Sequence, residues 1–316
     1  MMARYLLLRL LHSAVVLVVL SAVTYALMHF APGGPSVLMS PDIGAEEAAR
    51  MRANLGLDAP LHVQYLSWVS TVVRADFGRS FTDARPVREL IAERLPNTLL
   101  LSGAALLVAL VLGVSGGIVS ALKRGTIWDR LISFLSMIGV SIPLFWLAII
   151  AILIFAVRLR VLPSSGMSTI GADWAFDDAL RHLIMPASVL STVFIAQFAR
   201  YTRAEMISVL GLDYIRTARA KGLAGRTVVL RHALRNALIP LVTVIGLAVP
   251  VLVGGAAITE TIFGWPGMGR LAVDAAFRRD YPVVMGVTVL FAVIVIVANL
   301  LVDVLYCYLD PRVKLG

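Results

Sequence analysis

The chain has 316 residues, of which 59% are hydrophobic and only 15% are charged. A soluble globular domain carries about 25% charged residues, so this composition excludes an ordinary soluble protein. The single cysteine excludes an internal disulfide and a metal cluster built from several cysteines. The net charge of +9 could suggest nucleic acid, but in a membrane protein a basic excess commonly reflects the enrichment of Lys and Arg in cytoplasmic loops.

Six apolar runs without Asp, Glu, Lys or Arg are each long enough to cross a hydrocarbon core of about 30 Å as a helix. The runs are 10–30, 98–119, 131–157, 183–199, 236–259 and 282–302. We therefore predict an all-α integral membrane protein with six transmembrane helices, forming a single permease-like domain over residues 1–316. Pro32-Gly33-Gly34-Pro35 makes a poor signal-peptide cleavage site, so we interpret the first run as an uncleaved span.

The distribution of charge predicts the orientation in the membrane. With six spans, the two termini, the loop around 123–130 and the loop 200–235 lie on one face, which carries a large excess of Lys and Arg over acids. The other face holds residues 31–97, 158–182 and 260–281, where bases and acids are almost balanced. The basic face is expected to be cytoplasmic, with both termini inside. This explains the basic excess without a nucleic-acid partner.

The external segment 31–97 is long enough to fold. Residues 41–56 and 86–95 are predicted helices, and the apolar, aromatic run 61–73 is predicted to be a helix lying along the membrane surface. Two interpretations remain open for this segment, namely a packing cap over the outer mouth and a binding role.

Two spans contain candidate pathway or gate residues. Pro143 in the third span, two residues after Ser141, frees a backbone carbonyl and predicts a kink. Gly254 and Gly255 in the fifth span permit close helix contact or, alternatively, widen a pore, and Glu260 stands at the end of that span. For both spans we favour a packing role, with pathway lining as the alternative.

Several kinds of chemistry have no signature in the sequence. No Walker A pattern occurs, and the five histidines form no H-E-x-x-H motif. The six runs hold no central carboxylate or cation, although ion-driven carriers commonly need such groups. We therefore predict a chain that is not an enzyme, with no catalytic or metal-ligating residues, and a pathway that depends on an outside motor.

The stretch 213–223 in the long basic loop is the strongest local signal. Asp213 is predicted to cap a helix start, and Gly222 to end the helix in a left-handed conformation. Arg219 and Lys221 lie near the helix C-terminus, where the helix dipole favours cations. The small residues Thr217, Ala218 and Ala220 would let another surface approach closely. A short, capped, basic helix of this kind is suited to docking on a partner.

This stretch resembles the EAA loop of ABC-importer permeases, and most closely that of the dipeptide/oligopeptide/nickel subfamily, in which the present chain looks like the first of two permease types. The matching segments are Arg216-Thr217-Ala218-Arg219-Ala220-Lys221-Gly222, residues 5–9, 31–33, 55–60, 76–80, 93–98, 231–236, 262–269 and 310–312. The general EAA pattern has glutamate in place of Arg216 and proline in place of Arg235, so the contacts of that glutamate do not transfer to this chain.

The resemblance implies a type I ABC-importer permease fold in the inner membrane. It implies a second homologous permease, two ABC ATPases and an extracytoplasmic substrate-binding protein as partners, besides membrane lipid. It places ATP and Mg on the ATPases, so that this chain needs no cofactor. The residues implied in coupling to the ATPases are Asp213, Tyr214, Arg216, Thr217, Ala218, Arg219, Ala220, Lys221, Gly222 and Leu223.

Import of di- or oligopeptides is the expected function. The same machine with nickel, glutathione or an oligosaccharide as cargo is the alternative, and the spans lack the His, Cys or Asp grouping that nickel would favour. A membrane receptor or sensor that signals through the basic loop is a more remote alternative.

Overall fold

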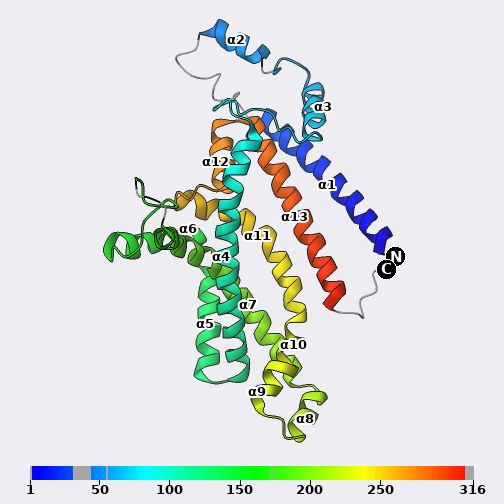
Figure 1. Cartoon of the computed structure of the whole chain (residues 1–316), viewed down its shortest axis with the longest axis vertical. Coiled ribbons are helices and arrows are strands. Elements are labelled where there is room, and N and C mark those ends of the chain that lie inside the picture. Colours follow the sequence, from blue (N-terminus) through cyan, green and yellow to red (C-terminus); the bar gives the residue numbers. More distant parts are fainter. Residues whose placement is uncertain (1, 31–43, 55, 172, 174, 310–316) are drawn as a thin grey trace. The chain divides into compact units, whose positions relative to one another are not determined.

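The computed structural model describes residues 2–30, 44–54, 56–171, 173 and 175–309, and the described secondary structure is helical apart from an isolated bridge between Arg79 and Pro86. In chain order the helices are α1 (Met2–Phe30), α2 (Ala45–Asn54), α3 (Leu61–Val72), α4 (Val87–Leu122), α5 (Ile127–Ser141), α6 (Leu144–Ala151), the π-helical η2 (Ile152–Arg158), α7 (Phe176–Leu210), α8 (Asp213–Ala220), α9 (Gly225–Thr227), the π-helical η3 (Val228–Ala233), α10 (Leu234–Ala237), α11 (Ile239–Ile262), α12 (Met268–Arg278) and α13 (Tyr281–Leu309) (Figure 1).

The described helices confirm the predicted all-helical membrane class. Five of them are long and apolar enough to cross a membrane, within α1, α4, α7, α11 and α13. The pair formed by α5 and by α6 with η2 would be a sixth span if it is counted as one. Five of the six predicted runs lie on one of these helices or on the bent pair, and the run 236–259 begins in α10 (Leu234–Ala237) and continues along α11.

The third predicted span is broken rather than kinked. The chain bends by 102° between Ile127–Ser141 and Leu144–Arg158. The residue before a proline is restricted to extended conformations, and Ile142 accordingly has φ −82° and ψ 126°. Pro143 continues the extended geometry, with φ −58° and ψ 132°, before α6 begins. Two successive extended residues redirect the chain much further than the missing hydrogen bond of one proline would.

At Pro96 the result is the opposite. We predicted a separate helix over 86–95, but α4 runs for 36 residues straight through Pro96. Two hydrogen bonds hold the helix just after the proline: Asn97 Nδ2 donates to the Pro266 carbonyl at 2.8 Å, and Thr98 Oγ1 accepts from the Met268 amide at 2.7 Å. External bonds of this kind offset the bond that proline removes.

Within the predicted single domain, the described residues form two compact units. Unit 1 falls within Met1–Thr98 and Pro266–Ile296, and unit 2 within Leu99–Trp265 and Val297–Leu315. The core of unit 1 is built by the start of α4, by α12 and by α13, through Val87, Leu90, Met268 and Val283. A buried carboxylate, Asp280, accepts hydrogen bonds from the loop before α4, at the hydroxyl of Ser80 and the amides of Phe81 and Thr82.

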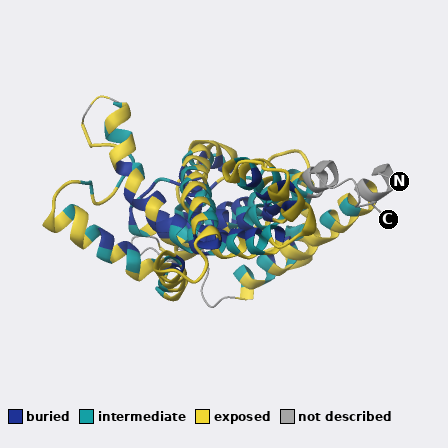
Figure 2. Ribbon diagram, turned by 90° about the horizontal axis from the view of Figure 1, so that it is seen from below, coloured by how far each residue is buried: buried dark blue, intermediate teal, exposed yellow. Residues whose placement is uncertain are grey.

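The core of unit 2 lies where α4, α7 and α11 pack together. Its fully buried side chains include Leu101, Phe198 and Trp265. Figure 2 shows buried residues inside the packed helices and exposed residues along their outer faces. Because many of the exposed residues are Leu, Val and Phe, the outer faces are suited to lipid rather than to water.

Candidate functional site

The predicted docking segment folds as the helix α8, at the end of unit 2 where α7 finishes (Figure 1). The prediction that Asp213 caps this helix is wrong. Leu212 occupies the capping position with φ −75° and ψ 150°, and no side chain caps the helix. Asp213 is the first helical residue, and its side chain is 94% exposed. Its Oδ1 atom lies 3.4 Å from Nη1 of Arg216. A carboxylate in the first turn still interacts favourably with the helix dipole.

The prediction for the other end of α8 is confirmed, because Gly222 is left-handed with φ +76°. The Gly222 amide donates to the Arg219 carbonyl at 2.9 Å, and the Leu223 amide donates to the Ala218 carbonyl at 3.3 Å. This pair of bonds is the Schellman pattern that ends many helices at a glycine. The helix is therefore closed by its own backbone.

Alanine at position 222 is expected to destabilise the end of α8 by about 1 kcal/mol, because a side chain disfavours the left-handed region. Open space surrounds the glycine, so the effect comes from the backbone conformation alone. Hydrogen exchange of the α8 amides should become faster by the factor in the opening equilibrium that corresponds to this loss of free energy. Gly225→Ala is the matched control, since Gly225 also has open space around it but no positive φ; equal exchange in both variants would contradict the role of Gly222.

The inner face of α8 is anchored in a hydrophobic cluster. Ile215 is 0% exposed and Ala218 is also buried. From its small size we expected Ala218 to be open to a partner, but it faces the interior instead. The residues of this group, which we call the α8 cluster, are Ala121, Met206, Val209, Ile215, Ala218, Val228, Ala233 and Ala237. The cluster joins α8 to the ends of α4 and α7 and to η3 and α10. Since close-packed cores resist deformation, α8 is rigidly attached to these helices.

The outer face of α8 is basic and exposed. Arg216, Thr217, Arg219, Ala220 and Lys221 are all exposed. Leu223, just beyond the helix, is exposed as well.

Tyr214 has a partner within the chain. Its hydroxyl accepts a hydrogen bond from Asn236 Nδ2 at 2.9 Å and donates to the His232 carbonyl at 3.4 Å. The tyrosine thus fixes α8 to η3 and α10. It is a structural tie as well as a candidate docking residue.

A buried ion pair next to the α8 cluster was missed by the sequence reasoning. Asp129, at the start of α5, accepts two hydrogen bonds from Arg203 of α7, from Nε at 2.7 Å and from Nη2 at 3.0 Å. The same carboxylate accepts from the Ser120 hydroxyl and, at 2.9 Å, from the Gly125 amide. One side chain thereby holds the turn between α4 and α5 against α7. The sequence offered one signal for this ion pair, because Asp129 is an isolated acid in a basic loop. Its partner Arg203 lies 74 residues further along the chain, so the sequence did not identify the pair.

The five candidate pathway residues do not gather at one described cavity. Ser141 and Gly254 are exposed, whereas Glu260 is 0% exposed. Pro143 begins α6, and Gly255 follows Gly254 in α11. A cavity of about 190 Å³ in unit 2, between α4, α5 and α7, is lined by none of the five. Among the described residues, no group of three or more His, Cys, Asp or Glu side chains is arranged to hold a metal ion.

Comparison with known proteins covers almost the entire chain. Residues 113–315 match the family described as "Binding-protein-dependent transport system inner membrane component", and residues 2–102 match the corresponding N-terminal family. The oligopeptide transport system permease protein AppB of Bacillus subtilis is 43% identical over 99% of this chain and 100% of its own length. The dipeptide transport system permease protein DppB of Escherichia coli K12 is 42% identical over 93% of this chain and 94% of its own.

Solved structures show the same fold. The inward-facing MetNI methionine ABC transporter matches with a TM-score of 0.58 and 20% identity, over 71% of this chain and 97% of that chain. The match supports the fold of ABC-importer permeases. The family models and the relatives agree along the whole chain. The chain therefore belongs to the family of binding-protein-dependent transport system inner membrane components, and it is a non-catalytic membrane subunit of such a transport system.

Proposed function

We propose that this chain is the permease subunit of an ATP-driven importer of di- and oligopeptides. The relatives named above transport oligopeptides and dipeptides, and a further relative at 43% identity is a di/tripeptide permease of Pseudomonas aeruginosa. A second permease, two ATPases that hold ATP and Mg, and an external binding protein complete the proposed machine. The side of the membrane that carries α8 and the two termini is proposed to be cytoplasmic, on the basis of the charge distribution.

The observation that carries the coupling role is the division of α8 into two faces. Its inner side chains are locked into the α8 cluster, and its outer side chains present cations to a partner. A helix of eight residues is a rod of about 12 Å, closed at its end by Gly222. Such a rod can transmit a displacement from an ATPase to the ends of α4 and α7, whereas a flexible loop could not.

The pathway is proposed to follow α6 and α11, which pack together in unit 2. Gly254 has open space where a side chain would be, and Ser141 is exposed next to the break at Pro143. Gly255 belongs to the same proposed lining. Glu260 is fully buried in this conformation, so its part in a gate would require α11 to move.

Uptake by the reconstituted machine tests the proposed function. The four membrane and ATPase subunits are placed in vesicles with the binding protein and a labelled dipeptide. ATP-dependent uptake is expected, with competition by unlabelled dipeptides and not by Ni²⁺, glutathione or oligosaccharide. Competition by one of those three would assign the cargo to that class instead. Recovery of the chain without any ATPase, with signalling intact, would favour the receptor alternative.

Glutamate at position 219 is expected to weaken ATPase docking roughly tenfold, which corresponds to about 1.4 kcal/mol. The physical reason is that the substitution reverses a charge on the exposed face of α8, where complementary charges steer association. The measurement is the concentration of ATPase subunit that gives half-maximal substrate-stimulated hydrolysis. Arg74→Glu, at an exposed position in unit 1, is the control. Unchanged half-maximal stimulation in Arg219→Glu would contradict the docking role.

A further inference from the structure

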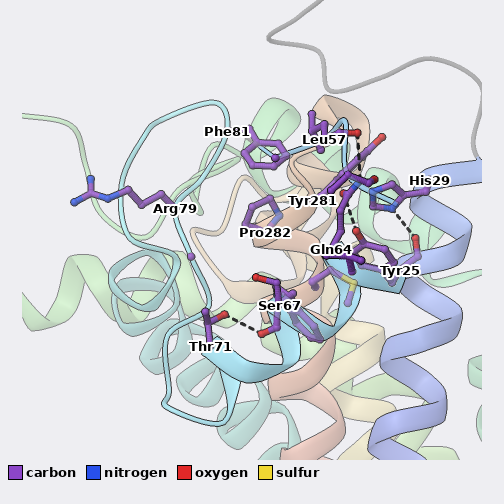
Figure 3. Close-up of a pocket in the computed structure, with 16 residues that line it drawn as sticks. Tyr25, His29, Leu57, Gln64, Ser67, Thr71, Arg79, Phe81, Tyr281 and Pro282 are labelled. Atoms are coloured by element: carbon purple, nitrogen blue, oxygen red, sulfur yellow. Dashed lines mark hydrogen bonds between the residues drawn. The ribbon is translucent and has the colours of Figure 1, made fainter. Parts of the chain in front are cut away.

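Unit 1 contains a cavity of about 550 Å³ that the proposed function does not use. Its walls come from α1, α3, the start of α13 and the loop before α4 (Figure 3). Five rings line it, those of Tyr25, His29, Trp68, Phe81 and Tyr281. The volume falls within the range of about 300–1,000 Å³ that is typical of sites for small organic ligands.

The walls of the cavity are already ordered by hydrogen bonds. The Tyr25 hydroxyl on α1 donates to Gln64 Oε1 on α3 at 2.9 Å. Gln64 Nε2 in turn donates to the carbonyls of Leu57 at 3.2 Å and Ala59 at 2.7 Å. The ring of His29 stacks on Tyr25, with 4.1 Å between their centroids. A preformed wall of this kind reduces the entropy that a ligand would lose by ordering it.

The cavity lies at one end of two candidate spans. Tyr25 and His29 belong to the last turns of the Leu7–Phe30 run, and Tyr281 begins the Tyr281–Val302 run. When these helices cross a membrane, the cavity is at the level of the headgroups, where Trp and Tyr rings are favoured. α3 also exposes Leu61, Val63 and Leu66, which suits a helix that lies on the membrane.

The charges and polar atoms of the lining decide between ligand classes. Among the residues that the structure describes, no Asp or Glu lines the cavity, so these side chains offer no carboxylate to the amino terminus of a peptide. Arg79 is on the lining and exposed, and Figure 3 shows it at the edge, with its guanidinium pointing away from the rings. Its Nη1 donates to the Ala84 carbonyl, and a guanidinium has four further N–H donors for an anion at the rim.

Two polar atoms of the lining are buried without a partner among the described residues: the indole N–H of Trp68 and Nε2 of His29. A buried donor that lacks a partner is unfavourable. An ester carbonyl in an otherwise apolar ligand would accept a hydrogen bond from the Trp68 indole N–H. The combination of aromatic rings, a buried indole donor and a cation at the rim matches an amphiphile with an acyl chain, an ester and an anionic headgroup.

We propose that this cavity binds one acyl chain of a membrane phospholipid, with the ester near Trp68 and the phosphate at Arg79. The lipid fills the space between α1, α3 and α13 and so holds α3 on the membrane surface. This inference does not depend on the docking role of α8.

Photo-crosslinking tests the proposal on the whole transporter in nanodiscs that contain phosphatidylglycerol with a diazirine on its acyl chain. Labelled peptides are expected to contain Trp68 or Met285, and native mass spectrometry is expected to retain one phospholipid for each copy of this chain. Ser67→Phe adds a ring to the lining and should remove the labelling. Ser70→Phe on the same helix is the matched control, because Ser70 is not part of the lining.

Arg79→Gln gives an independent test that does not alter the interior. It should lower labelling by the anionic lipid severalfold, whereas Arg74→Gln, at an exposed arginine outside the lining, should not. Equal labelling of the Ser67 and Ser70 variants would overturn the proposal. Loss of the label on addition of excess dipeptide would also overturn it, and would assign the cavity to cargo. Retained ATPase activity in each variant confirms that the transporter is assembled.

Discussion

Replacement of Asp129 by alanine is expected to destabilise unit 2 by about 3 kcal/mol, because removal of one partner of a buried ion pair leaves the other charge without compensation. The Asp129 side chain is 8% exposed and that of Arg203 is 33% exposed, which places the effect at the lower end for buried pairs. Arg203 would lose two hydrogen bonds, and Ser120 and the Gly125 amide would each lose one. The expected observations are a lower thermal midpoint and faster hydrogen exchange in the turn between α4 and α5.

The same change is expected to reduce transport, because this turn adjoins the α8 cluster through Ala121. The double variant Asp129→Ala with Arg203→Met should be less destabilised than the sum of its single variants, since no charge is then left unpaired. Glu46→Ala is the control, because its ion pair with Arg50 is exposed on both sides and such pairs contribute about 0–1 kcal/mol. If Glu46→Ala and Asp129→Ala lowered the thermal midpoint by similar amounts, the role of burial would be contradicted.

Features that depend on local chemistry could be predicted from the sequence. The long apolar runs identify the spans, because the hydrocarbon core excludes charge over a fixed length. Gly222 identifies the end of α8, because only a left-handed residue completes that bond pattern. The family resemblance rested on these local patterns too, and the comparisons confirm it.

Features that depend on distant residues could not be predicted. Leu212 rather than Asp213 occupies the capping position of α8, because the turn that follows α7 determines where α8 begins. α4 continues through Pro96 because residues 266 and 268 supply hydrogen bonds. The partner of Asp129 is on another helix. In each case the deciding atom comes from elsewhere in the fold, and a single sequence does not reveal which segments meet.

Replacement of Gly117 by alanine tests a second feature of this kind, the close contact between α4 and α7. A Cβ atom at position 117 would lie 2.6 Å from Thr202 Cβ and 2.7 Å from the Ala199 carbonyl oxygen. The carbonyl is backbone and cannot turn aside, so the two helices would have to separate. Overpacking of this kind costs about 1–3 kcal/mol. We expect the upper end because Gly113, one turn earlier, lies in a similar close contact, where a Cβ atom would be 2.8 Å from Phe198 Cβ and 2.9 Å from the Ile195 carbonyl oxygen.

The measurement is the thermal midpoint of the purified transporter, together with ATP-driven uptake. Gly103→Ala is the matched control on the same helix, because nothing lies within 4 Å of a Cβ atom there; alanine favours the helix over glycine by up to about 1 kcal/mol, so this variant should be neutral or slightly stabilised. If α4 and α7 slide past each other during transport, Gly117→Ala should lose uptake at temperatures where it remains folded, since even one methyl group blocks the contact. Full uptake with an unchanged midpoint would show that α4 and α7 do not approach this closely in the membrane.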